Sequence, residues 1–229
     1  MGLSTQKSTA TGRREQRRLQ HHDLSRAQLL DAAEEVFGRK GFHETTLKEV
    51  AELAAFSVGS VYSFFESKDD LFRAIFTRRG EQFMDEMRVV LRPGAQSPLD
   101  QLHALVEFQV GWFRRHARFG RLYLRYSSAA MLSADREADA VIADNYVESM
   151  RLQAELFARG QTAGVFRPGD PDVLAHLFSG IVSSYQAMDP AVIDDAPGRE
   201  RLALAQLHDL VEHAFAAASP AKSARRGRR

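Results

Sequence analysis

The stretch ETTLKEVAELAAFSVGSVYSFFESK, from Glu44 to Lys68, contains two short helical patterns separated by a tight turn. Thr46 and Glu49 have the spacing of a capping box, in which the hydroxyl and the carboxylate satisfy amides at a helix N-terminus. The apolar residues that follow recur at i, i+3, i+4 and i+7, which is the stripe of an amphipathic helix: Leu47, Val50, Ala51 and Ala54. The first half of the stretch therefore predicts a short helix with one buried face.

The second half starts again at Ser57, a residue type favoured at the N-cap of a helix. Val61 and Phe65 share one side of this second helix, and together with Phe56 they are expected to pack on the first helix. Two helices joined by a turn of three or four residues form the unit whose second helix enters the major groove of DNA. The stretch thus predicts a DNA-reading unit.

The outward positions of the second helix suit contact with DNA. Gly59 and Ser60 add little bulk, so the backbone can approach phosphate closely. Tyr62 can donate its hydroxyl to a phosphate, and Lys68 can supply a positive charge. The alternative is a helical hairpin whose aromatic residues all belong to the core. We prefer this core interpretation for Val61 and Phe65 only. The residues expected to face outward are Val58, Gly59, Ser60, Tyr62, Ser63 and Phe64.

Residues 25–76, SRAQLLDAAEEVFGRKGFHETTLKEVAELAAFSVGSVYSFFESKDDLFRAIF, resemble the N-terminal domain of TetR-family transcriptional regulators without a gap. The resemblance implies an all-α fold, with a three-helix DNA-binding domain followed by a helical domain for ligand binding and dimerisation. Two positions depart from the family pattern: Ala55 replaces a usual turn glycine, and Phe64 stands where histidine is frequent. The DNA contacts that the resemblance implies fall on Thr45 or Thr46, Ser57, Gly59, Ser60, Tyr62, Phe64 and Lys68.

The composition is that of a globular protein, with 44% hydrophobic and 27% charged residues. The absence of cysteine excludes disulfides, thiolate nucleophiles and thiolate metal sites, and it fits a cytoplasmic protein. We expect neither a membrane span nor a secretory signal, because no apolar run is long enough and the N-terminus is polar and basic.

Positive charge is concentrated at the two ends of the chain. Residues 1–26 carry six basic and two acidic side chains, and the stretch from Pro220 carries five basic and none acidic. Since the whole chain has a net charge of +1, the part between them has a net charge of −8. We expect residues 1–23 and 219–229 to be disordered basic segments, either following DNA phosphates or acting only as solvated tails.

Helical signals continue along the rest of the chain, with no convincing alternating strand. Ser25 and Gln28 predict the start of the first helix of a DNA-binding domain at residues 24–67. A connecting helix is expected at residues 68–92, within a helical domain at residues 68–218.

The last two predicted helices have apolar surface on more than one side, which requires more than one packing partner. We expect residues 172–188 and 196–218 to pair with the same segments of a second subunit, with burial inside one chain as the alternative. A two-fold dimer with one reading helix per subunit predicts a palindromic operator in double-stranded DNA.

Aromatic residues with a few polar groups gather in the middle of the chain, as in a pocket for a hydrophobic or aromatic small molecule. The alternative is ordinary core. The predicted ligand-binding residues are Phe108, Trp112, His116, Tyr123, Tyr126 and Tyr146.

No catalytic residue, metal ligand or cofactor is predicted, because no catalytic or metal-binding motif stands out. His208 and His213 are five residues apart, a poor shared face for a metal. The sequence favours a ligand-responsive transcriptional regulator, more specifically a repressor that works as a homodimer. A non-specific DNA-binding accessory protein is the alternative, and an enzyme has no support.

Overall fold

The computed structural model describes residues 5–94, 96–132, 137–193 and 203–217, and these residues form helices joined by short loops. The all-α prediction is confirmed for the described part of the chain, where β-structure is limited to one isolated bridge between Phe166 and Ala216. The helices are α1 (Thr5–Lys40), α2 (Leu47–Leu53), α3 (Val58–Phe64), α4 (Lys68–Val90), α5 (Pro98–Arg115), α6 (Ala117–Leu132), α7 (Glu137–Thr162), α8 (Pro171–Met188), α9 (Pro190–Ile193) and α10 (Leu204–Phe215).

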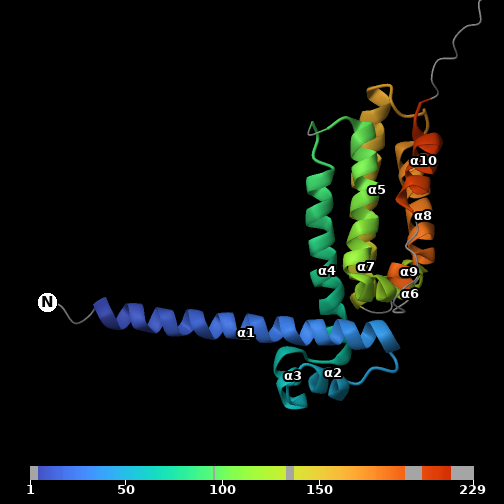
Figure 1. Ribbon diagram of the computed structural model, residues 1–229. Coiled ribbons are helices and arrows are strands. Elements are labelled where there is room, and N and C mark those ends of the chain that lie inside the picture. The colour runs from blue at the N-terminus through green and yellow to red at the C-terminus, as the bar shows by residue number, and fades with distance from the viewer. Residues whose placement is uncertain (1–4, 95, 133–136, 194–202, 218–229) are drawn as a thin grey trace, which may run out of the picture.

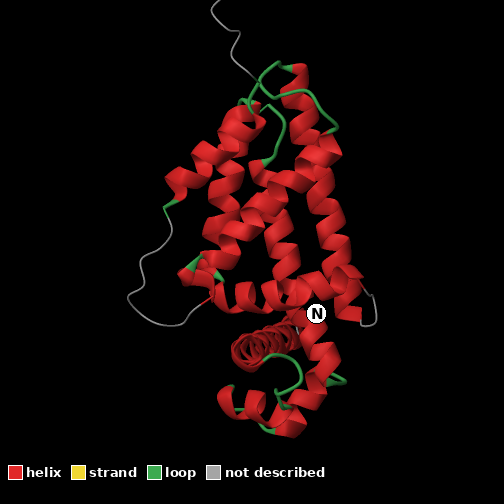
Figure 2. Ribbon diagram, turned by 90° about the vertical axis from the view of Figure 1, so that its right-hand side faces the viewer, coloured by secondary structure: helices red, strands yellow, loops and turns green. Residues whose placement is uncertain are grey.

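The molecule has two parts that meet along α1 (Figure 1). α2 and α3 lie on one side of α1, and the bundle of α5 to α10 lies on the other, with α4 running from the small unit into the bundle (Figure 1). The view turned by 90° shows the same division, with the short helix pair below the long bundle helices (Figure 2).

The small unit is held together by a continuous apolar core. Its inward residues come from the faces predicted by periodicity, and all are almost completely buried: Leu29, Leu30, Ala33, Val36, Phe37, Val50, Ala51, Val61, Phe65 and Leu71. Gly41 ends α1 with a φ of +80°, a conformation that glycine adopts without steric cost. The chain then turns into α2.

The expectation of a disordered arm at residues 1–23 is wrong for Thr5 onward, because α1 begins at Thr5 and is continuous to Lys40. The predicted helix start at Ser25 is also wrong, since Ser25 lies inside α1 and is buried. The segment before Ser25 is rich in Arg and Gln and contains no proline, so helix propensity continues the helix without an apolar stripe. The predicted tail at residues 219–229 lies outside the described residues.

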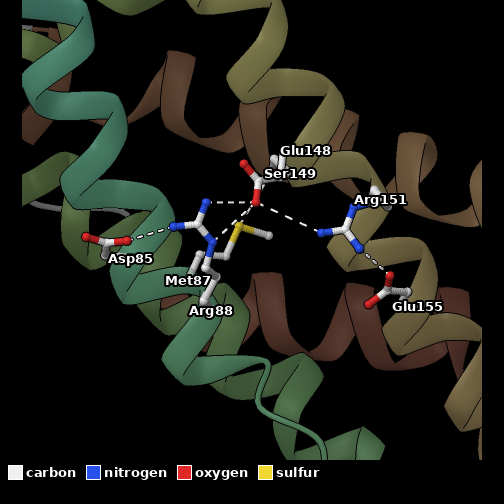
Figure 3. Close-up of polar contacts among 7 residues, drawn as sticks. All are labelled: Asp85, Met87, Arg88, Glu148, Ser149, Arg151 and Glu155. Atoms are coloured by element: carbon white, nitrogen blue, oxygen red, sulfur yellow. Dashed lines mark hydrogen bonds and ion pairs between the residues drawn. The ribbon is translucent and has the colours of Figure 1, made fainter.

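α4 connects the small unit with the bundle. Its N-cap is Ser67, whose side chain accepts a hydrogen bond from the Asp70 amide. Near the far end of α4, Arg88 donates to Glu148 of α7 at 2.7 Å and to Asp85 at 2.7 Å (Figure 3). Beside this pair, the Ser149 hydroxyl approaches the Met87 sulfur at 3.6 Å (Figure 3). This end of α4 is therefore fastened to α7.

The bundle is closed at its far end by packed aromatic rings. Phe157 of α7 contacts Phe166, Phe178 and Phe215, with ring centroids 5.1–6.1 Å apart. The loop after α7 is held to the end of α10 by hydrogen bonds from Arg167 and Ala217 amides. None of the described helices is long and apolar enough to span a membrane.

Candidate functional site

α2 and α3 form the helix pair that the sequence predicts, with both N-caps in place. The Glu49 amide donates to the Thr46 hydroxyl at 3.3 Å, and the Thr46 amide donates to Glu49 Oε2 at 3.0 Å, which completes the capping box. A hydrogen bond from Lys40, followed by the bonds from Thr46, lowers the pKa of Glu49 to about 2. The carboxylate of Glu49 thus ties the end of α1 to the start of α2.

The turn between the two helices contains a backbone conformation that is unfavourable for its residue. Ala55 has a φ of +58°, the left-handed region in which a β-carbon is crowded. The next amide, from Phe56, donates to the Ala51 carbonyl at 2.8 Å, so the turn is closed tightly. This is the position where the sequence replaces the usual glycine of the resembled family.

α3 presents one face to the core and the other to solvent. Val61 and Phe65 are 0% and 1% exposed, whereas Tyr62 is 57% exposed. Val58, Gly59 and Ser63 are also exposed, and Ser60 is half-buried. At the N-terminus of α3 the Ser60 amide donates to the Ser57 hydroxyl at 3.0 Å. The two neighbouring hydroxyls, of Ser57 and Ser60, are 2.8 Å apart. The outward surface of α3 is therefore small, polar and aromatic.

Three predicted DNA-contact residues have roles inside the protein. Thr45 is buried and donates its hydroxyl to the Gly41 carbonyl at 2.7 Å, so only Thr46 of the threonine pair is exposed. The Lys68 ammonium donates to the carbonyls of Phe42 and Thr45, at 2.9 Å and 3.1 Å. Phe64 is half-buried, and its ring lies 4.7 Å from the His22 ring of α1. Thr45 is thus corrected from a surface contact to a loop-stabilising residue.

A cavity of about 80 Å³ lies inside the bundle between α4, α5, α6, α7 and α8. Its wall combines aromatic rings with uncharged polar groups, and Arg79 is the charged side chain among the lining residues that the structure describes. The lining residues are Phe76, Arg79, Gly80, Phe83, Met84, Gln109, Trp112, Phe113, Phe119, Tyr123, Ile142, Asn145, Tyr146, Ser149, Met150, Ser179, Ser183 and Gln186.

Three of the six predicted ligand-binding residues line this cavity, namely Trp112, Tyr123 and Tyr146. Burial raises the pKa of Tyr123 to about 12, so its hydroxyl keeps its proton. Trp112 is completely buried, and its indole Nε1–H has no hydrogen-bond acceptor. A buried donor without an acceptor is costly, and this one belongs to a residue that lines the cavity.

The other three predicted residues are outside the cavity wall. Phe108 packs on Phe83 with ring centroids 5.0 Å apart, and His116 packs on Trp112 at 4.4 Å. Burial, followed by the nearby charge of Arg79, lowers the pKa of His116 and favours its neutral form. Tyr126 points to the small unit instead, where its hydroxyl accepts a hydrogen bond from the Phe42 amide at 2.6 Å.

The polar residues that α4, α7 and α8 contribute to the cavity wall were not predicted from the sequence. Arg79 and Asn145 stand in helices among many other polar residues, so residue type alone did not distinguish them. One available signal was Gly80, because a β-carbon there would come within 2.2 Å of the Asn145 amide nitrogen. A glycine inside a long helix indicates that another element approaches closely.

Arg79 also connects the cavity with α1. Its Nε and Nη2 donate to the two carboxylate oxygens of Glu34, at 2.7 Å and 3.1 Å. Glu34 is only 4% exposed and accepts a further bond from Arg78 at 3.1 Å. The cavity wall is therefore joined by a buried ion pair to the helix that braces the DNA-reading pair.

α8 and α10 leave an apolar surface uncovered. Leu177, Met188 and Leu210 are between 53% and 61% exposed, and together with Gly180 and Ile181 they line an open groove. Part of the predicted pairing segment, residues 196–202, lies outside the described residues. Within the described residues, no cluster of three or more His, Asp or Glu side chains could hold a metal ion.

Comparison with known proteins agrees with this geometry. Residues 29–75 match the family model described as "Bacterial regulatory proteins, tetR family". The HTH-type transcriptional regulator UidR of Escherichia coli K12 is 24% identical over 174 residues, covering 73% of this chain and 84% of that protein. The uncharacterized HTH-type regulator YfiR of Bacillus subtilis is 48% identical over 56 residues, but these span only 24% of this chain and 27% of YfiR.

A transcriptional regulator from Saccharomonospora viridis, solved in complex with choline, has the same fold. Its TM-score is 0.71 at 20% identity, over 86% of this chain and 100% of that chain. The helix-turn-helix pair, the helical bundle and these relatives define a DNA-binding transcriptional regulator and not an enzyme. The family match places the DNA-binding part of the chain, residues 29–75, in the TetR family of such regulators.

Proposed function

We propose that this regulator is a repressor that binds a palindromic operator as a homodimer and is released by a small molecule bound in the bundle cavity. The observation that carries the proposal is the position of α4, which begins beside the DNA-reading pair and forms one wall of the cavity. A molecule that changes the shape of the cavity must therefore act on α4, the helix that connects the cavity with the DNA-reading pair α2 and α3.

The proposed DNA contacts lie on the outward face of α3 and at the two helix starts. Tyr62 can donate to a phosphate, and the exposed Ser57, Gly59 and Thr46 bring hydroxyls and backbone close to the strand. Val58, at 38% exposure, offers an apolar side chain to a thymine methyl group. Lys68 is held by carbonyls, so we assign it a contribution to the local positive potential and not a free reach to phosphate.

α1 extends this surface. Arg14, Arg17 and Arg18 in the N-terminal half of α1 are exposed. The N-terminal part of α1 projects beyond the bundle (Figure 1). His22 on the same helix packs on Phe64 of the reading helix, which keeps this basic segment beside the DNA-facing side. We therefore propose that its arginines add sequence-independent phosphate contacts.

The homodimer is proposed to form through α8 and α10. Large apolar side chains rarely stay together on a free surface, and here Leu177, Met188 and Leu210 surround the small residue Gly180. A second copy of the same helix pair would cover them with two-fold symmetry. This arrangement gives two reading helices and therefore requires a palindromic operator. We propose that the dimer binds this operator in the cytoplasm.

Release is proposed to follow from the small size of the cavity. A free volume of about 80 Å³ is well below the ~300–1,000 Å³ of most ligand sites. A ligand would therefore favour an expanded bundle, in which α4 stands farther from α7 or α6. Differential binding of this kind gives coupling of about 1–3 kcal/mol between ligand and DNA.

Selection of bound sequences from a random duplex pool, followed by affinity measurements at two salt concentrations, tests this proposal. An enriched palindrome bound orders of magnitude more tightly than bulk DNA would support it. No enrichment, with binding that is lost as salt rises, would favour the non-specific accessory protein that the basic segments also permit.

A further inference from the structure

The formal charge in the described cavity wall is positive. Among its lining residues Arg79 is the only one with a formal charge, and Asp and Glu are absent from the described wall. The surrounding groups include hydrogen-bond donors, in particular the Trp112 indole, which is buried without an acceptor. The protonated Tyr123 hydroxyl is a further donor. A cavity with these properties suits a negatively charged group on an otherwise apolar molecule.

Arg79 can move from its partner Glu34 to a ligand, because a second arginine also pairs with Glu34. Glu34 is held by two guanidinium groups, with Arg79 Nε at 2.7 Å and Arg78 Nη2 at 3.1 Å. Arg78 in turn contacts Asp31 at 2.8 Å. If Arg79 turned toward a ligand, Glu34 would keep Arg78 and would not become an unpaired buried carboxylate, which is the costly outcome.

We propose that the effector is a small organic acid with an aromatic or aliphatic body, and that its carboxylate takes Arg79 away from Glu34. This inference rests on the proposed function, because it identifies the ligand class of that same cavity. The aromatic wall holds the apolar body, while Arg79 and the Trp112 N–H bind the carboxylate. Loss of the Arg79–Glu34 pair removes a link between α4 and α1, so ligand binding and operator release are coupled through one side chain.

Other ligand classes fit the wall less well. A trimethylammonium compound would find aromatic faces but would meet Arg79 with no acidic residue in the described wall. A neutral amide could accept from Trp112 but would leave the Arg79–Glu34 ion pair intact. The three classes therefore differ in how strongly they should compete for Arg79.

The test uses the full-length protein, its selected operator and a matched set of probes. Phenylacetate, 3-phenylpropanoate and octanoate are each compared with the corresponding amide and with a trimethylammonium analogue of similar length. Thermal unfolding reports binding, and fluorescence anisotropy of labelled operator reports release. We expect the best acid to release operator at a concentration about ten-fold lower than its amide, since bonds to charged groups are stronger than neutral ones.

Two variants identify the residue that reads the charge. Arg79→Gln should remove the preference for acid over amide, whereas Arg88→Gln should keep it, because Arg88 is an arginine of the same helix that pairs with Glu148 and does not line the cavity. Trp112→Phe provides a second test that leaves the ion pair in place, and it should weaken binding of the acids several-fold.

Several results would overturn the inference. They are amides or ammonium compounds acting as well as the acids, no acid acting at 1 mM, or an acid preference that survives Arg79→Gln. The proposed function fails separately, if the ligand-free protein selects no operator at all. A protein that selects an operator but ignores every acid would leave the regulator intact and refute only the ligand class.

Discussion

Replacing Ala55 by glycine should stabilise the protein, although it removes a methyl group. Ala55 has a φ of +58°, and an L-residue with a side chain loses roughly 1–2 kcal/mol in this region. Glycine removes that strain but gives the unfolded chain more freedom, at a cost of about 0.4–1 kcal/mol. The net expectation is a gain of up to about 1.6 kcal/mol, with a midpoint of about 0.8 kcal/mol, which corresponds to a rise of roughly 2–3 °C in Tm for a chain of this length.

The adjacent residue supplies a matched control. Ala54 has a φ of −79° and a ψ of −4°, a right-handed conformation that alanine adopts freely. Ala54→Gly should therefore lower stability by about 0.5–1 kcal/mol. Both variants are compared with the parent protein by thermal unfolding at one protein concentration, without ligand or DNA. If Ala55→Gly lowers Tm, or if both variants shift in the same direction, the strain assigned to the turn is wrong.

Four further variants test the reading face, the dimer and the cap. Tyr62→Phe should weaken binding to every duplex alike, by about five-fold for each lost hydrogen bond and therefore by about 25-fold for a dimer that loses two, while Phe64→Ala should change the selected base at one position in each half-site. Both are measured by repeating the selection and the titrations. Leu210→Glu places a charge on the exposed apolar groove and should give monomers in sedimentation at micromolar concentration, and a persistent dimer would contradict the proposed interface. Glu49 has a folded-state pKa near 2 against an ordinary 4.5, so its stabilisation is complete above about pH 4.5 and is lost as the pH falls toward 2. Urea unfolding at pH 5.5 and pH 3 should therefore show a stability gap to Glu49→Gln that narrows in acid, and a constant gap would exclude this role.

Local signals predicted the starts of α2, α3 and α4, whereas the start assigned to Ser25 was wrong. The N-caps Thr46, Ser57, Ser67, Ser97 and Asp170 all accept hydrogen bonds from amides of the following turn. Such caps involve residues two or three positions apart, so they can be recognised without knowledge of the tertiary structure. The apolar stripes of α1, α2 and α3 were predictable for the same reason.

Features that depend on distant parts of the chain were not predictable. Tyr126 was assigned to a ligand pocket, but its hydroxyl meets the Phe42 amide, 84 positions earlier in the sequence. His116 and Tyr123 are seven residues apart, yet only Tyr123 lines the cavity, because α5 ends at Arg115 and the chain changes direction. The polar part of the wall requires Arg79 and Asn145, from α4 and α7, to be brought together, and no local pattern predicts that approach.

The length of α1 has a mechanical consequence. Its 36 residues, at about 1.5 Å each, make a rod of roughly 54 Å. The rod is anchored to the bundle near its C-terminal end, where Gly38 lies against the backbone of Arg118 and Glu34 pairs with α4. A tilt of only about 5° at that anchor would move the far end of the rod, about 45 Å away, by roughly 4 Å. A fluorescent label near the start of α1 would therefore report amplified motion from a change of atomic size at the cavity.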